Sequence, residues 1–468
     1  MQRYVTRMFA DQWQQWVPAV VVITVMATMI GLCVHQFAWT GDPLFRTAAS
    51  AAGVPVEEFQ ILSVTIYAVV ALVSWVALTV VGKASVHAIR RTHALWLLLG
   101  TSPAVVLGST LLLLTVVSLC GAILGALLST LLSFWALPAF NTMVSSAVQL
   151  PTYTPTAWAP IVVIVVSVLT ALGGGLSPAR QASRTPPGAA LRSLDGLGRK
   201  SASVPRVVCG VFFFLVAFSL VISAGFADSL GVTTPAPMFN LTIIAGGSSL
   251  IAVYLLCPQI ASFIFWVLTG VFSRTGLVVS ALGTRSAASR GPVSATTIAP
   301  LAAGLGSIGL LLCSVNSVIA FAEIFQPDGQ ANRADTWMMV IVIALMMLAT
   351  SAAVVALSAS GREHEIALLQ AAGMRGRRQV VAMIASESFA MSLAASIIAA
   401  VPVAFGGLVF VLASQATLGG GTAVVAWPVP AMLVGLIASW AALFIILLAP
   451  ALTPLREGPS TQLRQQEI

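Results

Sequence analysis

Few residues in this 468-residue chain have the types and spacing that enzyme chemistry requires. The four histidines, His35, His87, His93 and His364, are scattered along the sequence and predict no metal site. No G-x-x-x-x-G-K-[ST] motif occurs, so no P-loop ATP site is expected, and G-L-G-S at residues 304–307 is interpreted as packing glycine within an apolar run. The energy for any work must then come from another polypeptide or from an ion gradient.

The most distinctive polar segment is Gly361–Arg378, GREHEIALLQAAGMRGRR, between two long apolar runs. A weaker copy, Arg91–Pro103 (RTHALWLLLGTSP), lies 273 residues earlier, with Gly100 at the position of Gly373. Both are predicted to be short amphipathic helices ended by a glycine at the same membrane face. Two related helices suit a partner with two-fold symmetry, such as a pair of ATPase subunits. The alternative is an interfacial helix whose arginines bind lipid phosphate.

The docking interpretation assigns contact with the ATPase to residues of both segments. The first copy is more apolar and has Thr92 where the second has Glu365, so the two surfaces are expected to be unequal. Basic residues near the end of the second helix, including Arg375, are expected to complement its dipole. The expected coupling residues are Arg90, Arg91, Leu95, Leu98 and Gly100 in the first copy, and Arg362, Glu365, Ile366, Leu369, Ala372, Gly373, Arg377 and Arg378 in the second.

Two polar residues within predicted spans are further candidates. Glu387 is expected about one turn into its span, where an ionisable group is costly. It could be structural, could snorkel or pair with Arg377 or Arg378, or could act in lateral gating or proton coupling. Asn316 is expected to donate a hydrogen bond to a neighbouring helix. The position equivalent to Glu387 in the first half of the chain is Leu114, so its role would not be symmetric.

Composition predicts an all-α polytopic membrane protein. Charged residues are 8% of the chain and the mean hydropathy is +1.00, and continuous apolar runs are long enough to cross about 30 Å of hydrocarbon. Ten spans are predicted, at residues 17–36, 61–82, 104–136, 158–176, 207–227, 241–272, 294–322, 337–359, 380–413 and 427–450.

The distribution of charge predicts the orientation. With the N-terminus inside, all 22 basic residues except Arg46 and Arg333 fall in inner segments, as the positive-inside rule requires. The expected location is a bacterial plasma membrane, with both termini cytoplasmic and no cleavable signal peptide. Nucleic acid is not expected as a partner, because membrane topology accounts for the net charge of +8.

An internal duplication predicts the domain organisation. Arg184 and Arg456, and likewise Arg192 and Arg464, are 272 residues apart, in agreement with the spacing of the glycines. We expect a first permease unit over 1–192, a linker with two connecting spans over 193–273, and a second unit over 274–468. Two spans between the units give both the same orientation, so the repeat is parallel.

The second unit resembles the FtsX-like, or MacB-like, permeases of ABC transporters. The resemblance is carried by Arg362, Glu365, Ile366, Leu369, Ala372, Gly373, Arg377, Arg378 and Gln379, and by P-A-R-Q-A-S-R at residues 178–184. It implies four helices in each unit and a dimer of cytosolic ATPases. Members of this type carry large external domains, which the short outer segments 37–60 and 323–336 cannot hold.

The resemblance implies the membrane subunit of an ABC transporter, without ATP binding of its own. ATP and Mg would be bound by the partner ATPase, and the substrate would be hydrophobic or amphiphilic: a lipid, an antibiotic or a peptide. Two alternatives remain open: a permease that transmits motion to an extracytoplasmic hydrolase or sensor kinase, and an ion-coupled secondary transporter. An ATPase with a P-loop encoded next to this chain would favour the first two.

Overall fold

The computed structural model describes residues 13–51, 100–144, 151–183, 204–229, 235–274, 278–289, 291–325, 377–418 and 424–456, together with positions 56, 75 and 96 and several between 337 and 352. Eight helices in this part of the chain are long and apolar enough to cross a bilayer. This confirms the predicted all-α polytopic class. The helices are α2 (Trp13–Thr40), α3 (Pro43–Ala51), α6 (Pro103–Val144), α7 (Ala159–Ser183), α9 (Val204–Ala224), α10 (Pro235–Arg274), α11 (Val278–Ser289), α12 (Gly291–Phe325), α15 (Arg377–Thr417) and α16 (Val429–Arg456).

The helices coincide with eight of the ten predicted spans and extend beyond most of them. Helix α7 runs on to Ser183, so residues 177–183 are helical rather than part of the expected loop. Helix α16 likewise continues to Arg456, through the equivalent arginine-containing segment. The predicted spans 61–82 and 337–359 lie largely outside the described residues, so the count of ten stays a prediction.

Contacts divide the chain into two compact units. Unit 1 comprises Met1–Gly196 with Asn332–Ala353, and unit 2 comprises Leu197–Ala331 with Val354–Ile468. Helices α9 and α10, predicted as connecting spans, therefore make their contacts with the helices of unit 2.

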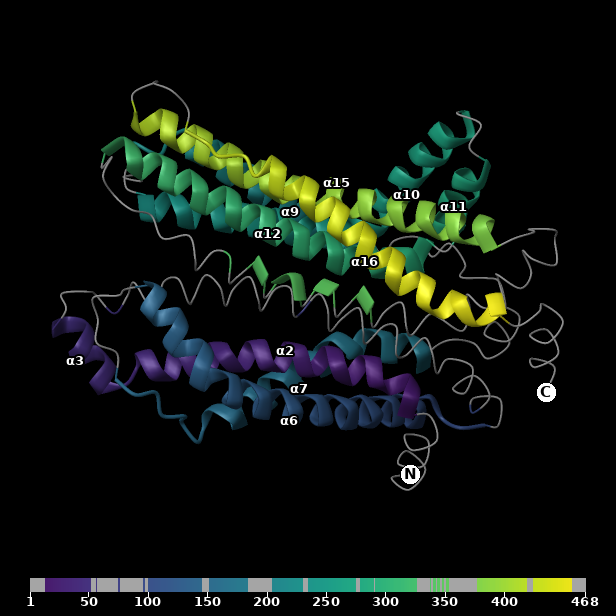
Figure 1. Cartoon of the computed structure of the whole chain (residues 1–468), viewed down its shortest axis with the longest axis horizontal. Helices are drawn as coiled ribbons and strands as arrows, with labels where there is room; N and C mark the ends of the chain where they lie inside the picture. The colour runs from purple at the N-terminus through teal and green to yellow at the C-terminus, as the bar shows by residue number, and fades with distance from the viewer. Residues whose placement is uncertain are drawn as a thin grey trace. The chain divides into compact units, whose positions relative to one another are not determined.

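In unit 1, α2, α6 and α7 pack side by side (Figure 1). Helix α6 carries Gly121 and Gly125, which let it approach the backbone of α2 closely: a Cβ at Gly125 would lie 2.7 Å from the Thr24 carbonyl oxygen. The Thr28 hydroxyl donates to the Gly125 carbonyl at 3.4 Å. Small residues and interhelical hydrogen bonds are the usual basis of helix association in lipid, where the hydrophobic effect gives no drive.

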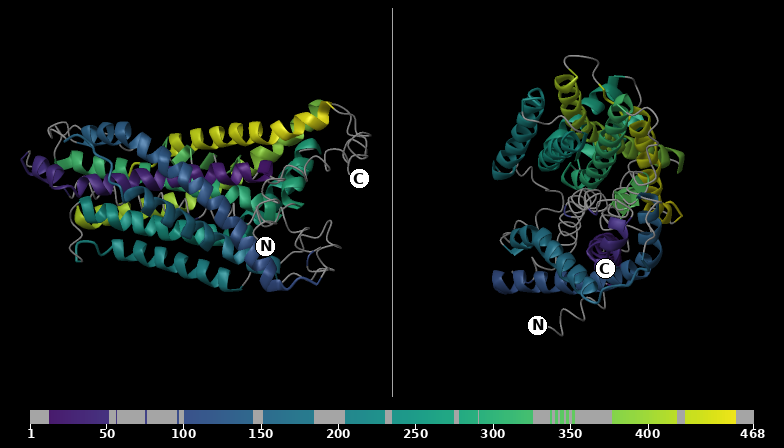
Figure 2. Two further views of the ribbon diagram at one scale, coloured as in Figure 1. Left: turned by 90° about the horizontal axis from the view of Figure 1, so that it is seen from below. Right: turned by 90° about the vertical axis from the view of Figure 1, so that its left-hand side faces the viewer.

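In unit 2, α15 packs against α10, α11, α12 and α16 (Figures 1 and 2). Helix α12 is the most deeply placed span, with 89% of its apolar window buried, whereas α9 and α16 have 17% buried. The exposed apolar side chains of α9, including Phe212, Leu215 and Phe218, are compatible with lipid contact. Between α15 and α16, the Ser392 and Ser439 hydroxyls are 2.5 Å apart.

Glycines mark the same helix contact in both units. In α2, Gly31 lies against Ser129 of α6 and Val163 of α7. In α12, Gly309 lies against Val403 of α15 and Met432 of α16. The first helix of each trio thus approaches the other two through a glycine, as expected for an internal duplication.

Candidate functional site

The first predicted docking helix ends in a turn that the structure describes. Trp96 is helical, and Gly100 has a φ of 84°, a conformation that residues with a Cβ rarely adopt. The Thr101 N–H donates to the Trp96 carbonyl oxygen at 3.0 Å, which is the six-to-one hydrogen bond of a Schellman C-cap. The predicted end of this helix at Gly100 is confirmed.

Helix α6 begins directly after this turn. The Ser102 carbonyl oxygen accepts hydrogen bonds from the Val105 N–H at 3.0 Å and the Val106 N–H at 3.3 Å. Pro103 takes the first helical position, where its missing N–H leaves no bond unmade. Because only Thr101 and Ser102 separate Gly100 from the first residue of α6, the turn offers few rotatable bonds between the two helices.

Most of the predicted coupling residues lie outside the described part of the chain. Trp96 and Gly100 are described in the first segment, and α15 begins with the last two residues of the second. The docking role of the others stays a prediction: Arg90, Arg91, Leu95, Leu98, Arg362, Glu365, Ile366, Leu369, Ala372 and Gly373.

The basic pair of the second segment opens α15. Arg377 is the first residue of the helix, and the side chain of Arg378 is exposed. Cations at a helix N-terminus are disfavoured by the helix dipole, so local helix stability does not explain this pair. Contact with a partner or with anionic lipid would explain it.

Glu387 lies in the interior of unit 2. Its side chain is 1% exposed, and α11 packs against α15 at this point. Gly283 of α11 makes the approach possible, because a Cβ there would lie 2.8 Å from the Met383 carbonyl oxygen and 3.2 Å from the Glu387 nitrogen. Arg378 is nine residues away in the same helix, about 13 Å along the axis and on the opposite face. The geometry of α15 therefore excludes the predicted pairing of Glu387 with Arg378.

The other predicted intramembrane residue, Asn316, is half-buried on α12. Its neighbour Ser317 makes the described contact with the segment before α16, since the Ser317 hydroxyl oxygen accepts a hydrogen bond from the Ala426 N–H at 3.0 Å. The expected hydrogen bond from Asn316 to a neighbouring helix stays a prediction.

The helix that follows each docking segment is the centre of its unit. In unit 1, α6 contacts both α2 and α7. In unit 2, α15 contacts α9, α10, α11, α12 and α16. A displacement delivered to the start of α6 or α15 would thus reach every described spanning helix of that unit through direct packing.

A polar cluster joins α2, α6 and the segment before α7, and the sequence did not predict it. The Tyr153 hydroxyl and His35 Nδ1 are 2.8 Å apart, and His35 Nε2 lies 3.3 Å from the Thr130 hydroxyl. Next to it, the amides of Gln36 and Asn141 exchange two hydrogen bonds, of 2.8 and 3.0 Å.

Burial accounts for the character of this cluster. His35, Gln36 and Asn141 are buried, and burial raises the pKa of the Tyr153 phenol above 10.0, against an opposing effect of the Ser133 hydroxyl. The partners lie 95 to 118 residues apart. The available signal was the presence of three polar side chains, His35, Gln36 and Asn141, at the predicted outer ends of apolar spans.

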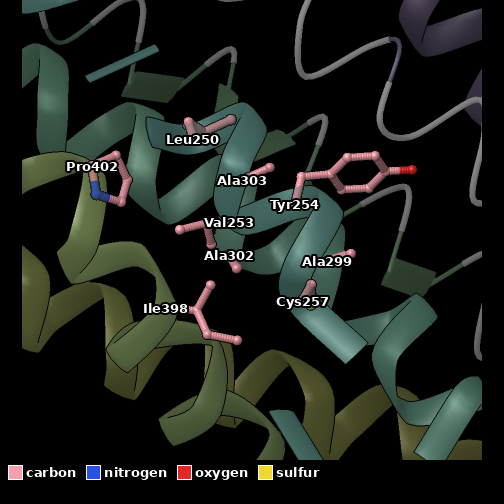
Figure 3. A pocket seen from close by; sticks show the side chains of 9 residues that line it. All are labelled: Leu250, Val253, Tyr254, Cys257, Ala299, Ala302, Ala303, Ile398 and Pro402. Carbon is pink, nitrogen blue, oxygen red and sulfur yellow. The ribbon is translucent and has the colours of Figure 1, made fainter. Parts of the chain in front are cut away.

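A small cavity lies within unit 2, between α10, α12 and α15. It has a volume of about 10 Å³, close to the space needed for a single water. The lining is apolar apart from Tyr254 and Cys257 of α10, and Figure 3 shows Ala299 and Ala302 of α12 and Pro402 of α15 around it. The three alanine side chains of α12 here, which include Ala303, leave the gap.

Comparison with known proteins was made for the whole chain. The model of the FtsX-like permease C-terminal domain matches twice, at residues 64–187 and 336–459. Equivalent ends of the two matches, residues 64 and 336 and residues 187 and 459, each differ by 272, the spacing that the arginines and glycines predict. No curated protein and no solved structure matches the chain. Together the two matches cover more than half of the sequence, and the chain belongs to the FtsX-like permease family.

Proposed function

We propose that this chain is moved by a dimer of cytosolic ATPases bound to segments 90–103 and 361–378, and that it exports or extracts a hydrophobic or amphiphilic substrate. Membership of the FtsX-like family makes it a multi-pass permease component of an ABC-type system, in which a separate ATPase is implied. ATP and Mg would be bound by that ATPase. The proposed location is the plasma membrane, with both termini in the cytoplasm.

The observation that carries the proposal is the turn at Gly100. The capped helix before it is the first predicted docking helix, and α6 begins two residues after Thr101. A short turn of fixed conformation passes on a displacement that a long loop would absorb. Because α6 contacts both α2 and α7, closure of the ATPase dimer would move the described spanning helices of the first unit together.

Two glycines give a matched test. Gly100 and Gly108 both have open space where a Cβ would be, but only Gly100 has a positive φ. The change Gly100→Ala should strain the turn by about 1–2 kcal/mol, whereas Gly108→Ala removes a glycine from a helix interior and should be neutral or stabilising. We expect Gly100→Ala to lower substrate-stimulated ATPase activity by about fivefold or more.

The measurement uses the chain co-purified with its ATPase in lipid nanodiscs. Gly100→Asn should retain more activity than Gly100→Ala, since asparagine tolerates the left-handed conformation better. Equal stimulation and transport in Gly100→Ala and Gly108→Ala would contradict the coupling role. Failure of any ATPase to co-purify with the chain would contradict the proposal as a whole.

A further inference from the structure

Helix α10 is broken internally at Pro258, whose partners were not predicted from the sequence. Proline has no N–H, so the Tyr254 carbonyl oxygen, four residues earlier, loses its helical donor. The proline ring also crowds that carbonyl and bends the helix there. In an apolar environment a carbonyl oxygen without a donor is costly, so a substitute donor is expected at such a bend.

The substitute comes from another helix. Arg206, in the first turn of α9, donates from Nη2 to the Tyr254 carbonyl oxygen at 3.2 Å and from Nε to the Leu255 carbonyl oxygen at 2.8 Å. Its guanidinium carbon lies 6.0 Å from the centre of the Tyr254 ring. The planar guanidinium can serve two adjacent acceptors, which a lysine ammonium does less well.

The packing around Arg206 holds the two helices at this distance. One turn further along α9, Gly210 is buried against α10, where a Cβ would lie 2.9 Å from Leu256 Cγ. Arg206 itself is half-buried. The two hydrogen bonds and the close contact at Gly210 fix α9 against α10 on the N-terminal side of Pro258.

The bend adjoins the cavity of unit 2. Tyr254 and Cys257, on the N-terminal side of the bend, line it together with Pro402 of α15 (Figure 3). Helix α12 has its own interior proline, Pro300, beside the lining residue Ala299. Three helices with interior prolines thus meet where packing is incomplete, an arrangement that permits one helix to change its bend against the others.

We propose that Arg206 supplies the donor that Pro258 lacks, and that α9 thereby sets the bend of α10 where it meets α12 and α15. This gives the inserted pair α9–α10 a role as a splint for the second unit. The inference concerns contacts within this chain, so it stands or fails independently of the proposed transport function.

A double-mutant cycle tests the role of Arg206. The variants are Arg206→Met, Pro258→Ala and the double variant, with Arg285→Met on α11 as a control for loss of one charge. Pro258→Ala restores the N–H that can bond the Tyr254 carbonyl, so Arg206 should then matter little. We expect Arg206→Met to lower the midpoint of thermal unfolding by about 3 °C or more in the native background, and by less than half as much with Pro258→Ala.

The bend can be measured directly with spin labels. Ile244 and Trp266 are exposed residues of α10 on either side of Pro258, suitable for labelled cysteines in a background without the five native cysteines. The distance distribution between the labels should broaden in Arg206→Met and narrow again in the double variant. Arg206→Lys should fall between the native chain and Arg206→Met.

Each outcome decides the inference. An equal loss of stability from Arg206→Met in both backgrounds, or no loss in either, would overturn it, since Arg206 would then act independently of the proline. If Arg206→Met fails to accumulate in membranes, recovery of its level by Pro258→Ala supports the inference, and no recovery overturns it. An unchanged distance distribution in Arg206→Met would also overturn it.

Discussion

Gly283 places α11 against the inner part of α15, where a methyl group would come within 2.8 Å of a backbone carbonyl oxygen. A flexible side chain could move aside, but the carbonyl of Met383 belongs to a continuous helix and cannot. The contact also buries Glu387, so its 1% exposure depends on the absence of a side chain on another helix. Close packing by glycine is thus the residue-scale feature that shields the one acidic residue of this span.

Substitution of this glycine should separate the two helices. We expect Gly283→Ala to destabilise the protein by about 1–3 kcal/mol, because overpacking forces backbone shifts. Gly270→Ala on α10 is the matched control: it has open space at its Cβ and should be neutral or stabilising. Thermal unfolding in detergent measures both, and a Gly283→Ala protein as stable as the control would show that α11 is free to move away.

The residues that the sequence predicted well are those whose structure depends on near neighbours. The helix end at Gly100 follows from a glycine after an amphipathic stretch, and its hydrogen bond spans five residues. Arg206 could be placed at the inner side, but its acceptors lie 48 and 49 residues away. Tyr153 and His35 are 118 residues apart. No periodicity in a single sequence encodes such pairs, since they arise only when helices pack.

At the scale of elements, the crossing of α2 and α6 rests on G-A-I-L-G, residues 121–125. A Cβ at Gly121 would lie 2.8 Å from Ile23 Cβ and 3.0 Å from the Val20 carbonyl oxygen. This G-x-x-x-G pattern in an apolar helix is typical of close helix contacts in membranes. The crossing joins the helix that follows the first docking segment to the first span.

Bulk at this crossing should force the helices apart. Gly125→Leu is expected to destabilise the first unit by about 2 kcal/mol or more and to abolish the Thr28 hydrogen bond. Gly108→Leu, at an open position of the same helix, is the control. Protease sensitivity of the purified protein checks the prediction, and equal digestion of both variants would contradict it.

The helices themselves were largely predictable because each spanning helix is a long apolar run. Their ends were less so. Residues 177–183 contain proline, serine and arginine and favoured a loop, yet α7 continues through them. Helix α3 lies in a segment expected to be loop, where Phe45 and Ala49 are buried against Trp39 and Leu137. A helix of nine residues gives too short a pattern to stand out, and its stability comes from that contact.

At the scale of the whole molecule, the repeat spacing and the positive-inside bias point to the same arrangement. Both matched regions are separated by 272 residues, and the inserted α9–α10 pair falls between the first match and the second. An even number of inserted spans keeps the two permease units in the same orientation. Both docking segments are then predicted to face the cytosol.

Cysteine accessibility tests this orientation. In a background without the five native cysteines, Arg46→Cys before the middle of α3 should react with a membrane-impermeant maleimide on intact cells. Arg285→Cys on α11 should react only after the membrane is permeabilised. Labelling of both from the same side would contradict the predicted topology and, with it, a common cytosolic partner for the two docking segments.

The burial of α12 has a consequence for how the protein is made. Ribosomal synthesis delivers α12 before α15 and α16, the two later helices that cover it. Its surface of alanine, glycine, leucine and serine carries no charge between Thr297 and Phe321, so the helix can wait alone in lipid. A chain that stops before Arg377 would leave this small-residue surface without its cover. We expect membrane quality-control proteases to remove such truncated chains faster than the complete protein.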